Sequence, residues 1–154
     1  MTAGPLQPGR GTGTADGPPS PPRVFRLQDG STALGLAAAF LAPMPAFARL
    51  GFGGWTSILI GAINRGHYLF VGDEARVRAF ACWAHASAED AERWTRRQSD
   101  PTREDGTTGD CLIINAWAAT DRAANATLLA AMRRSIGGRR IYARPARPSV
   151  PPRP

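Results

Sequence analysis

The sequence contains no lysine, only two cysteines and only two histidines. All nineteen basic residues are arginines, and with twelve acidic residues they leave a formal net charge of +7. Cys82 and Cys111 both lie within apolar runs, and two cysteines are too few for the disulfide framework of a small secreted protein. We therefore expect two buried free thiols in a reducing compartment.

Long apolar runs are also absent. The longest, residues 33–42 and 58–63, are far shorter than the roughly 18 residues of a membrane-spanning helix, and no secretory signal opens the chain. The expected location is the cytoplasm, with attachment at the periphery of a membrane-associated complex as an alternative. A GC-rich genome is the simplest explanation for the arginines. Their charge also suits acidic proteins, anionic lipid and nucleic acid, although no stacking-aromatic motif or recognition-helix pattern favours nucleic acid.

The two ends of the chain are too poor in apolar residues to form a core. Residues 1–30 are rich in Gly, Pro, Thr and Ser, and residues 144–154 hold five of the fourteen prolines. The sequence therefore predicts an extended or disordered arm at 1–30, one folded domain at 31–145 and a Pro/Arg-rich tail at 146–154.

Hydrophobic periodicity between these ends predicts an α/β domain with a mostly antiparallel central sheet flanked by helices. Ser31 or Thr32 is the expected cap of the first helix, Ser87 of the third, and Thr120 or Asp121 of the last. The expected elements, in chain order, are helices at 32–41 and 55–63, strands at 68–71 and 77–83, a helix at 87–97, a strand at 110–117, a helix from 121 to the Gly137-Gly138 pair, and a strand around 141–142.

Three sequence blocks follow one another in a distinctive order. They are Met44-Pro45-Ala46-Phe47, Tyr68 with Cys82-Trp83-Ala84, and Thr108-Gly109-Asp110 with Ala116-Trp117. In order and spacing these blocks resemble the toxin-activating lysine acyltransferases, bacterial enzymes that fatty-acylate internal lysines of RTX protoxins. The resemblance covers roughly residues 33–145 and implies a GNAT-like acyltransferase fold.

The catalytic positions of that family differ in this chain. The family carries a histidine in a Ser-Pro-x-His segment and an aspartate before the tryptophan of the third block, and these positions fall on Phe47 and Ala116. A neutral imidazole can accept a proton from a lysine ammonium group, and a carboxylate orients the imidazole. Phenylalanine and alanine do neither, so no catalytic residue is assigned. His67, His85 and Asn115 are the remaining candidates, and Asn115 can take the aspartate's place only through a β-bulge.

Other chemical constellations are weaker. Cys82 and His85 are three residues apart on a strand, so their side chains should diverge, and no spacing among the two cysteines and two histidines is typical of a zinc site. We expect no bound cofactor or metal. Three arginine pairs could instead contact an acidic partner, or simply be solvated: Arg96-Arg97, Arg133-Arg134 and Arg139-Arg140.

These observations favour a catalytically silent relative of the toxin-activating acyltransferases. It would act as a binding or structural subunit of a larger assembly and contact a protein partner through residues 1–30 and 146–154. The alternative is an active protein-lysine fatty acyltransferase, with acyl carrier protein as partner and as donor of the acyl chain.

Overall fold

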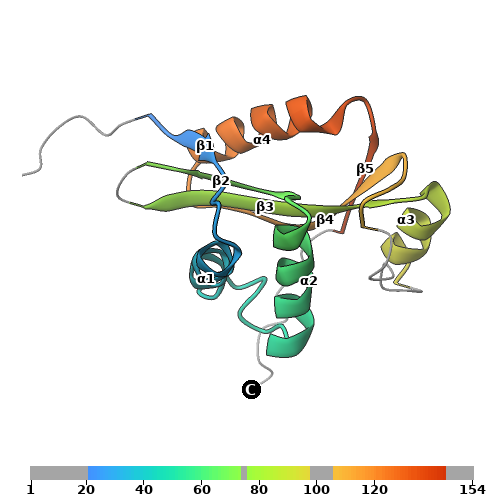
Figure 1. Cartoon of the computed structure of the whole chain (residues 1–154), viewed down its shortest axis with the longest axis horizontal. Coiled ribbons are helices and arrows are strands. Elements are labelled where there is room, and N and C mark those ends of the chain that lie inside the picture. The colour runs from blue at the N-terminus through green and yellow to red at the C-terminus, as the bar shows by residue number, and fades with distance from the viewer. Residues whose placement is uncertain (1–20, 74–75, 98–105, 145–154) are drawn as a thin grey trace, which may run out of the picture.

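The computed structural model describes residues 21–73, 76–97 and 106–144, which form one open sheet with helices on both faces (Figure 1). The strands lie in chain order, each antiparallel to the next except for the last pair, β4 and β5, which are parallel. The predicted α/β class with a mostly antiparallel sheet is confirmed. The elements are β1 (Arg23–Phe25), α1 (Gly30–Leu41), α2 (Phe52–Asn64), β2 (Tyr68–Gly72), β3 (Val77–Ala86), α3 (Ala88–Thr95), β4 (Cys111–Ala119), α4 (Arg122–Ile136) and β5 (Arg140–Ala143).

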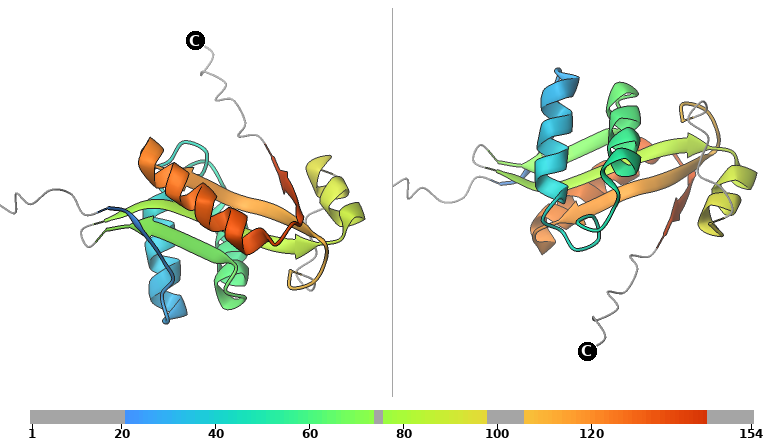
Figure 2. Two further views of the ribbon diagram at one scale, coloured as in Figure 1. Left: turned by 90° about the horizontal axis from the view of Figure 1, so that it is seen from above. Right: turned by 90° about the horizontal axis from the view of Figure 1, so that it is seen from below.

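The helices divide between the two faces of the sheet. The pair α1 and α2 lies on one face and α4 on the other, while α3 lies beyond the far end of the sheet near β5 (Figures 1 and 2). α4 connects β4 to β5, as a parallel pair requires, because a tight hairpin can join only antiparallel strands.

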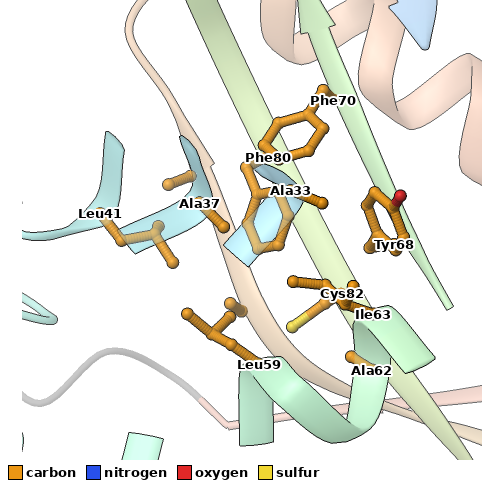
Figure 3. Close-up of a cluster of buried hydrophobic side chains, with 12 residues drawn as sticks. Ala33, Ala37, Leu41, Leu59, Ala62, Ile63, Tyr68, Phe70, Phe80 and Cys82 are labelled. Atoms are coloured by element: carbon orange, nitrogen blue, oxygen red, sulfur yellow. The ribbon is translucent and has the colours of Figure 1, made fainter. Parts of the chain in front are cut away.

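Three groups of buried side chains hold these layers together. The helix-pair core lies between the sheet and α1 and α2 (Figure 3), the α4 core lies on the opposite face, and the α3 core lies under α3. Buried members of the helix-pair core are Ala33, Ala37, Leu41, Leu59, Ala62, Ile63, Tyr68, Phe70, Phe80, Cys82, Ala116 and Ala118. Buried members of the α4 core are Leu69, Val71, Ala79, Ala81, Trp83, Leu112, Ala124, Leu128, Ala131, Met132 and Ile136. Those of the α3 core are Ala86, Ala91, Trp94, Cys111 and Ile113.

Side-chain caps explain where three of the helices begin. Asp29 accepts a hydrogen bond from the Thr32 amide at 2.6 Å, so α1 begins before the Ser31 or Thr32 cap that the sequence predicted. Ser87 caps α3 as expected, accepting from the Asp90 amide at 3.1 Å. Of the two candidates for α4, Asp121 is the cap, and the left-handed conformation of Gly137 ends that helix.

The folded region begins earlier than the sequence predicted. β1 lies within the segment assigned to the 1–30 arm, pairs antiparallel with β2 and stacks Phe25 on Phe70 at 5.4 Å between ring centroids. A run of three residues is too short to show the alternating pattern of a strand. β1 forms because its backbone pairs with the edge strand β2. Residues 1–20 and 145–154, and with them the predicted 146–154 tail, lie outside the described residues.

Candidate functional site

The two positions where the resemblance places catalytic groups lie on the same face of the sheet. Ala116 is a buried member of the helix-pair core, and Phe47, from the turns between α1 and α2, packs against that core. Of the twelve buried members, only Tyr68 and Cys82 carry a hydrogen on oxygen or sulfur. Tyr68 Oη donates to the Leu27 carbonyl at 2.8 Å, and burial raises the pKa of the Cys82 thiol to about 12. The buried members of this core therefore offer no proton acceptor for work near neutral pH.

A β-bulge lies beside Ala116. The pairing of β3 with β4 shifts between Cys82, opposite Ala116, and Trp83, opposite Ile114, so Asn115 is the extra residue. This irregularity is the condition under which Asn115 could take the place of the family's aspartate. The parallel pairing of β4 with β5 also ends at Ile114, so the bulge lies where β4 loses its second neighbour.

The structure brings the two histidines together. His67 lies just before β2 and His85 near the end of β3, and their rings stack with centroids 4.7 Å apart and planes tilted by 27°. The His67 ring also stacks on Trp83, a member of the α4 core, at 6.0 Å, and the His67 carbonyl accepts from the Trp83 amide at 3.0 Å. His67 therefore lies with Trp83 and carries His85 on its ring, and neither histidine belongs to the buried core that holds Ala116.

Arg65, the C-cap of α2, lies against this histidine pair. Its guanidinium packs between two glycines, since a Cβ on Gly106 would lie 2.6 Å from Arg65 Cζ and one on Gly61 would lie 3.0 Å from Arg65 Nη1. The Gly106 carbonyl accepts from the His85 amide at 3.1 Å, so the same residue contacts the arginine and the strand that carries His85. A Cβ at Gly106 would displace the guanidinium from this position, and one at Gly61 would crowd it.

Two polar atoms of this cluster are buried without a hydrogen-bond partner: Arg65 Nε and His67 Nδ1. Burial lowers the pKa of His67 to about 4, helped by the positive charge of His85, Arg65 and Arg26, while the Gly106 carbonyl acts in the opposite direction. Burial also lowers the pKa of His85, with Arg139 and Arg65 adding to the effect. Among the described residues, the permanently charged groups that shift the two imidazoles are all arginines, and both rings are neutral at pH 7.

The cysteines do not join this cluster. Cys82 belongs to the helix-pair core and Cys111 to the α3 core, and both are free thiols, as predicted. Since His85 stacks on His67, the side chains of Cys82 and His85 diverge and form no nucleophile pair. In the described ranges no three His, Cys, Asp or Glu side chains converge in a way that would hold a metal ion.

The arginine pairs lie at the ends of helices and are exposed. Arg133 and Arg134 occupy the last turn of α4, and Arg139 and Arg140 follow the glycine pair that ends it. Arg139 Nη1 donates to the Ile136 carbonyl at 3.2 Å. At the end of α3, Arg96 lies 3.6 Å from Glu92 and Arg97 adopts a positive φ of 60°.

An exposed apolar surface, which we call the α2 patch, was not identified from the sequence. It consists of Leu50, Phe52, Ile58 and Ile60, four of the six exposed large apolar side chains among the described residues. Phe52 is 78% exposed, and the buried residues of α2 all lie in its second half. Arg49 is the only charged residue between positions 30 and 64. The near absence of charge was the sequence signal for this exposed surface. It is ambiguous, because an apolar helix of this length is more often part of a core.

No helix in the described part of the chain is long and apolar enough to cross a bilayer. No family model matches the chain, and no curated protein matches its sequence significantly.

Proposed function

We propose that this chain is a catalytically silent relative of the toxin-activating lysine acyltransferases, with a GNAT-like fold, and that it serves as a binding subunit in a protein assembly. The helix-pair core carries the proposal. Phe47 and Ala116 contribute hydrocarbon where the resemblance implies a histidine and an aspartate, and no buried member of that core replaces them. His67 stacks between Trp83 and His85, and both histidines have lowered pKa values, which makes them weak bases at pH 7.

The α2 patch supports the binding role. A helix that is apolar on all sides is normally covered by other protein or by lipid, and α2 has apolar side chains facing away from its own core. Ile58 and Ile60 are exposed while Leu59 between them is buried. Positions two apart in a helix point about 200° away from each other, so the exposed pair flanks the helix on both sides. A flat lipid surface cannot cover both flanks, whereas a partner protein that wraps around α2 can.

Capture experiments with matched variants test this role. The full chain serves as bait in cytoplasm from its source, and a captured protein is then purified and titrated by calorimetry. Ile58→Ser and Phe52→Ser should each weaken binding about tenfold or more, as expected for apolar anchors in an interface. Leu129→Ser and Ile141→Ser remove exposed apolar side chains elsewhere, with exposures of 39% and 50% that bracket the 45% of Ile58, and should leave the affinity unchanged. Equal loss in all four variants would indicate nonspecific adhesion and overturn the proposal. Removing residues 1–20 tests whether the predicted arm contributes.

The bulge at Asn115 favours a second candidate, an active acyltransferase that draws its acyl chain from acyl carrier protein. Ala116 pairs with Cys82 and Asn115 is the extra, unpaired residue next to it, so an amide could occupy the region of the family's carboxylate. Incubation with labelled acyl-acyl carrier protein and acceptor proteins, followed by intact-mass measurement, separates the two. Lysine acylation that is lost in Asn115→Ala or His67→Phe would overturn the silent reading. Absence of acylation together with a stoichiometric partner would support it.

A further inference from the structure

The cluster of Arg65, His67 and His85 contains a buried donor without an acceptor, Arg65 Nε. Arg65 Nε is buried and unpartnered, and within the described ranges the guanidinium makes no hydrogen bond or ion pair. A buried donor left unpaired destabilises the folded state, and more so when the group is charged. Folded chains rarely retain such a cost unless a ligand or water removes it.

The charges around the cluster have the same sign. Arg65 and Arg26 act on His67, and Arg139 and Arg65 act on His85, while no carboxylate among residues 21–73, 76–97 and 106–144 acts on either imidazole. Arg26 donates to the Tyr68 carbonyl at 2.7 Å and Arg139 to a backbone carbonyl, so neither has its charge neutralised there. A partly buried group of cations that has no counter-ion in the described part of the chain produces a local positive potential that attracts an anion.

The surrounding backbone leaves space for the guanidinium and holds it in place. Gly61 and Gly106 lie on either side of it, and the Gly106 carbonyl is tied to the His85 amide. Arg65, His67 and His85 are each only partly buried, so the cluster reaches the surface. Arginine in a fixed orientation donates in a planar fork that matches the oxygens of carboxylate and phosphate groups.

We propose that Arg65 and His67, supported by the stacked His85, form a binding site for an oxyanion, the chemistry that phosphate and carboxylate groups share. The guanidinium donates to the anion, and Nδ1 of His67 donates to it once the ring is protonated. This site is independent of the partner role of the α2 patch, and either can fail without the other.

Proton uptake gives the site a signature that a structural cluster lacks. In the free protein, burial, the charge of His85 when it is protonated, and the cations Arg65 and Arg26 hold the pKa of His67 near 4, and an anion at Nδ1 would raise it. Binding therefore takes up a proton, and affinity should increase as the pH falls from about 7.5 to about 5.5. Sulfate is the informative probe, because it carries the same charge throughout this range.

The test is an NMR titration of the full chain with sodium sulfate, phosphate or acetate, at ionic strength matched with sodium chloride. We expect saturable shifts of the Arg65 and His67 side-chain nitrogen resonances, with sulfate binding at least about threefold tighter at the lower pH. Saturation by sulfate and phosphate alone identifies a phosphate-binding site, and saturation by acetate alone a carboxylate-binding site. Failure of all three anions to saturate overturns the proposal.

Variants separate binding from folding. Arg65→Gln and His67→Phe should weaken binding about tenfold, and Gly106→Ala should do the same by placing a Cβ where the guanidinium lies. Phenylalanine keeps the aromatic stack, so His67→Phe remains a fair test if Arg65→Gln fails to fold. Arg93→Gln removes an exposed arginine from α3 and should change affinity less than twofold. The role of the imidazole would be overturned if His67→Phe bound sulfate as tightly as the wild type does, or if the sulfate affinity of the wild type did not change with pH.

Discussion

Gly109 has a backbone conformation that other residues rarely adopt. Its φ is +121°, and a Cβ there would lie 2.2 Å from the Ala86 carbonyl oxygen. The glycine of the Thr108-Gly109-Asp110 block is thus explained by the close approach of the turn to the end of β3. It supports the fold and implies nothing about chemistry.

Gly109→Ala should therefore destabilise the protein by about 1–3 kcal/mol, through backbone strain and the clash with Ala86. Gly35→Ala is the matched control, because Gly35 lies inside α1 with open space around its Cβ position. That change should stabilise by about 0.5–1 kcal/mol. Urea unfolding measures both, and equal effects of the two substitutions would show that the glycine environments have been misassigned.

His67 makes stability depend on pH. The unfolded chain protonates this imidazole below about pH 6.5, whereas the folded chain resists protonation until about pH 4. Because the unfolded state binds more protons in this window, stability must fall as the pH falls through it. Partial exposure of the ring reduces the effect to roughly 1–3 kcal/mol.

Thermal unfolding from pH 7 to pH 4 checks this expectation. The wild type should lose stability on acidification, and His67→Phe should show a shallower loss because the ring stack remains and the proton site is gone. The stability of this variant should still fall somewhat with pH, because the pKa of His85 is also lowered in the folded state. A steeper loss in His67→Phe would contradict the assignment.

At the scale of elements, α3 depends on its first turn. It spans only Ala88–Thr95, and Ser87 satisfies the Asp90 amide while its hydroxyl donates to the Asp90 carboxylate at 2.8 Å. Short helices are marginal without such caps and without packing, which here comes from Ala91 and Trp94.

Ser87→Ala should cost about 1 kcal/mol, and Ser87→Thr should retain most of the cap. Native-state hydrogen exchange is the sharper readout, since the loss should appear first in the amides of α3 while those of β3 and β4 remain protected. Uniform loss of protection across the sheet would mean that α3 does not open separately.

The elements that the sequence predicted correctly are those with a local signal. The Ser87 cap, the apolar run of β4 and the Gly137 stop are all readable from neighbouring residues. β1 was missed because its pairing comes entirely from β2. Arg65 was missed for a similar reason: its segment indicates a helix stop, and only the fold brings Gly106 against it. The bulge at Asn115 likewise depends on β3 and has no signal in β4 alone.

At the scale of the whole molecule, the sheet separates two cores that share no buried side chain. Leu59 lies in the helix-pair core and Leu128 in the α4 core, on opposite faces of the sheet. Each is almost completely buried. Truncating either side chain to alanine should leave a cavity in its own core without changing the packing of the other core.

Leu59→Ala and Leu128→Ala should each destabilise by roughly 2–5 kcal/mol. Their effects should add to within about 0.5 kcal/mol in a double-mutant cycle, because the sites have no common partners. Guanidinium unfolding of the four proteins gives the coupling energy. A coupling well above that value would show that the sheet transmits repacking from one face to the other.

The placement of the two free thiols has a kinetic consequence. Cys82 is covered by α1 and α2, whereas Cys111 is covered by α3, and neither is accessible in the folded state. A reagent that alkylates thiols can therefore reach each only when its own cover lifts. When the other cysteine is replaced by serine, the alkylation rate of the remaining thiol reports how often the helices that cover it open. A partner that binds α2 should therefore slow the alkylation of Cys82 and leave the alkylation rate of Cys111 unchanged.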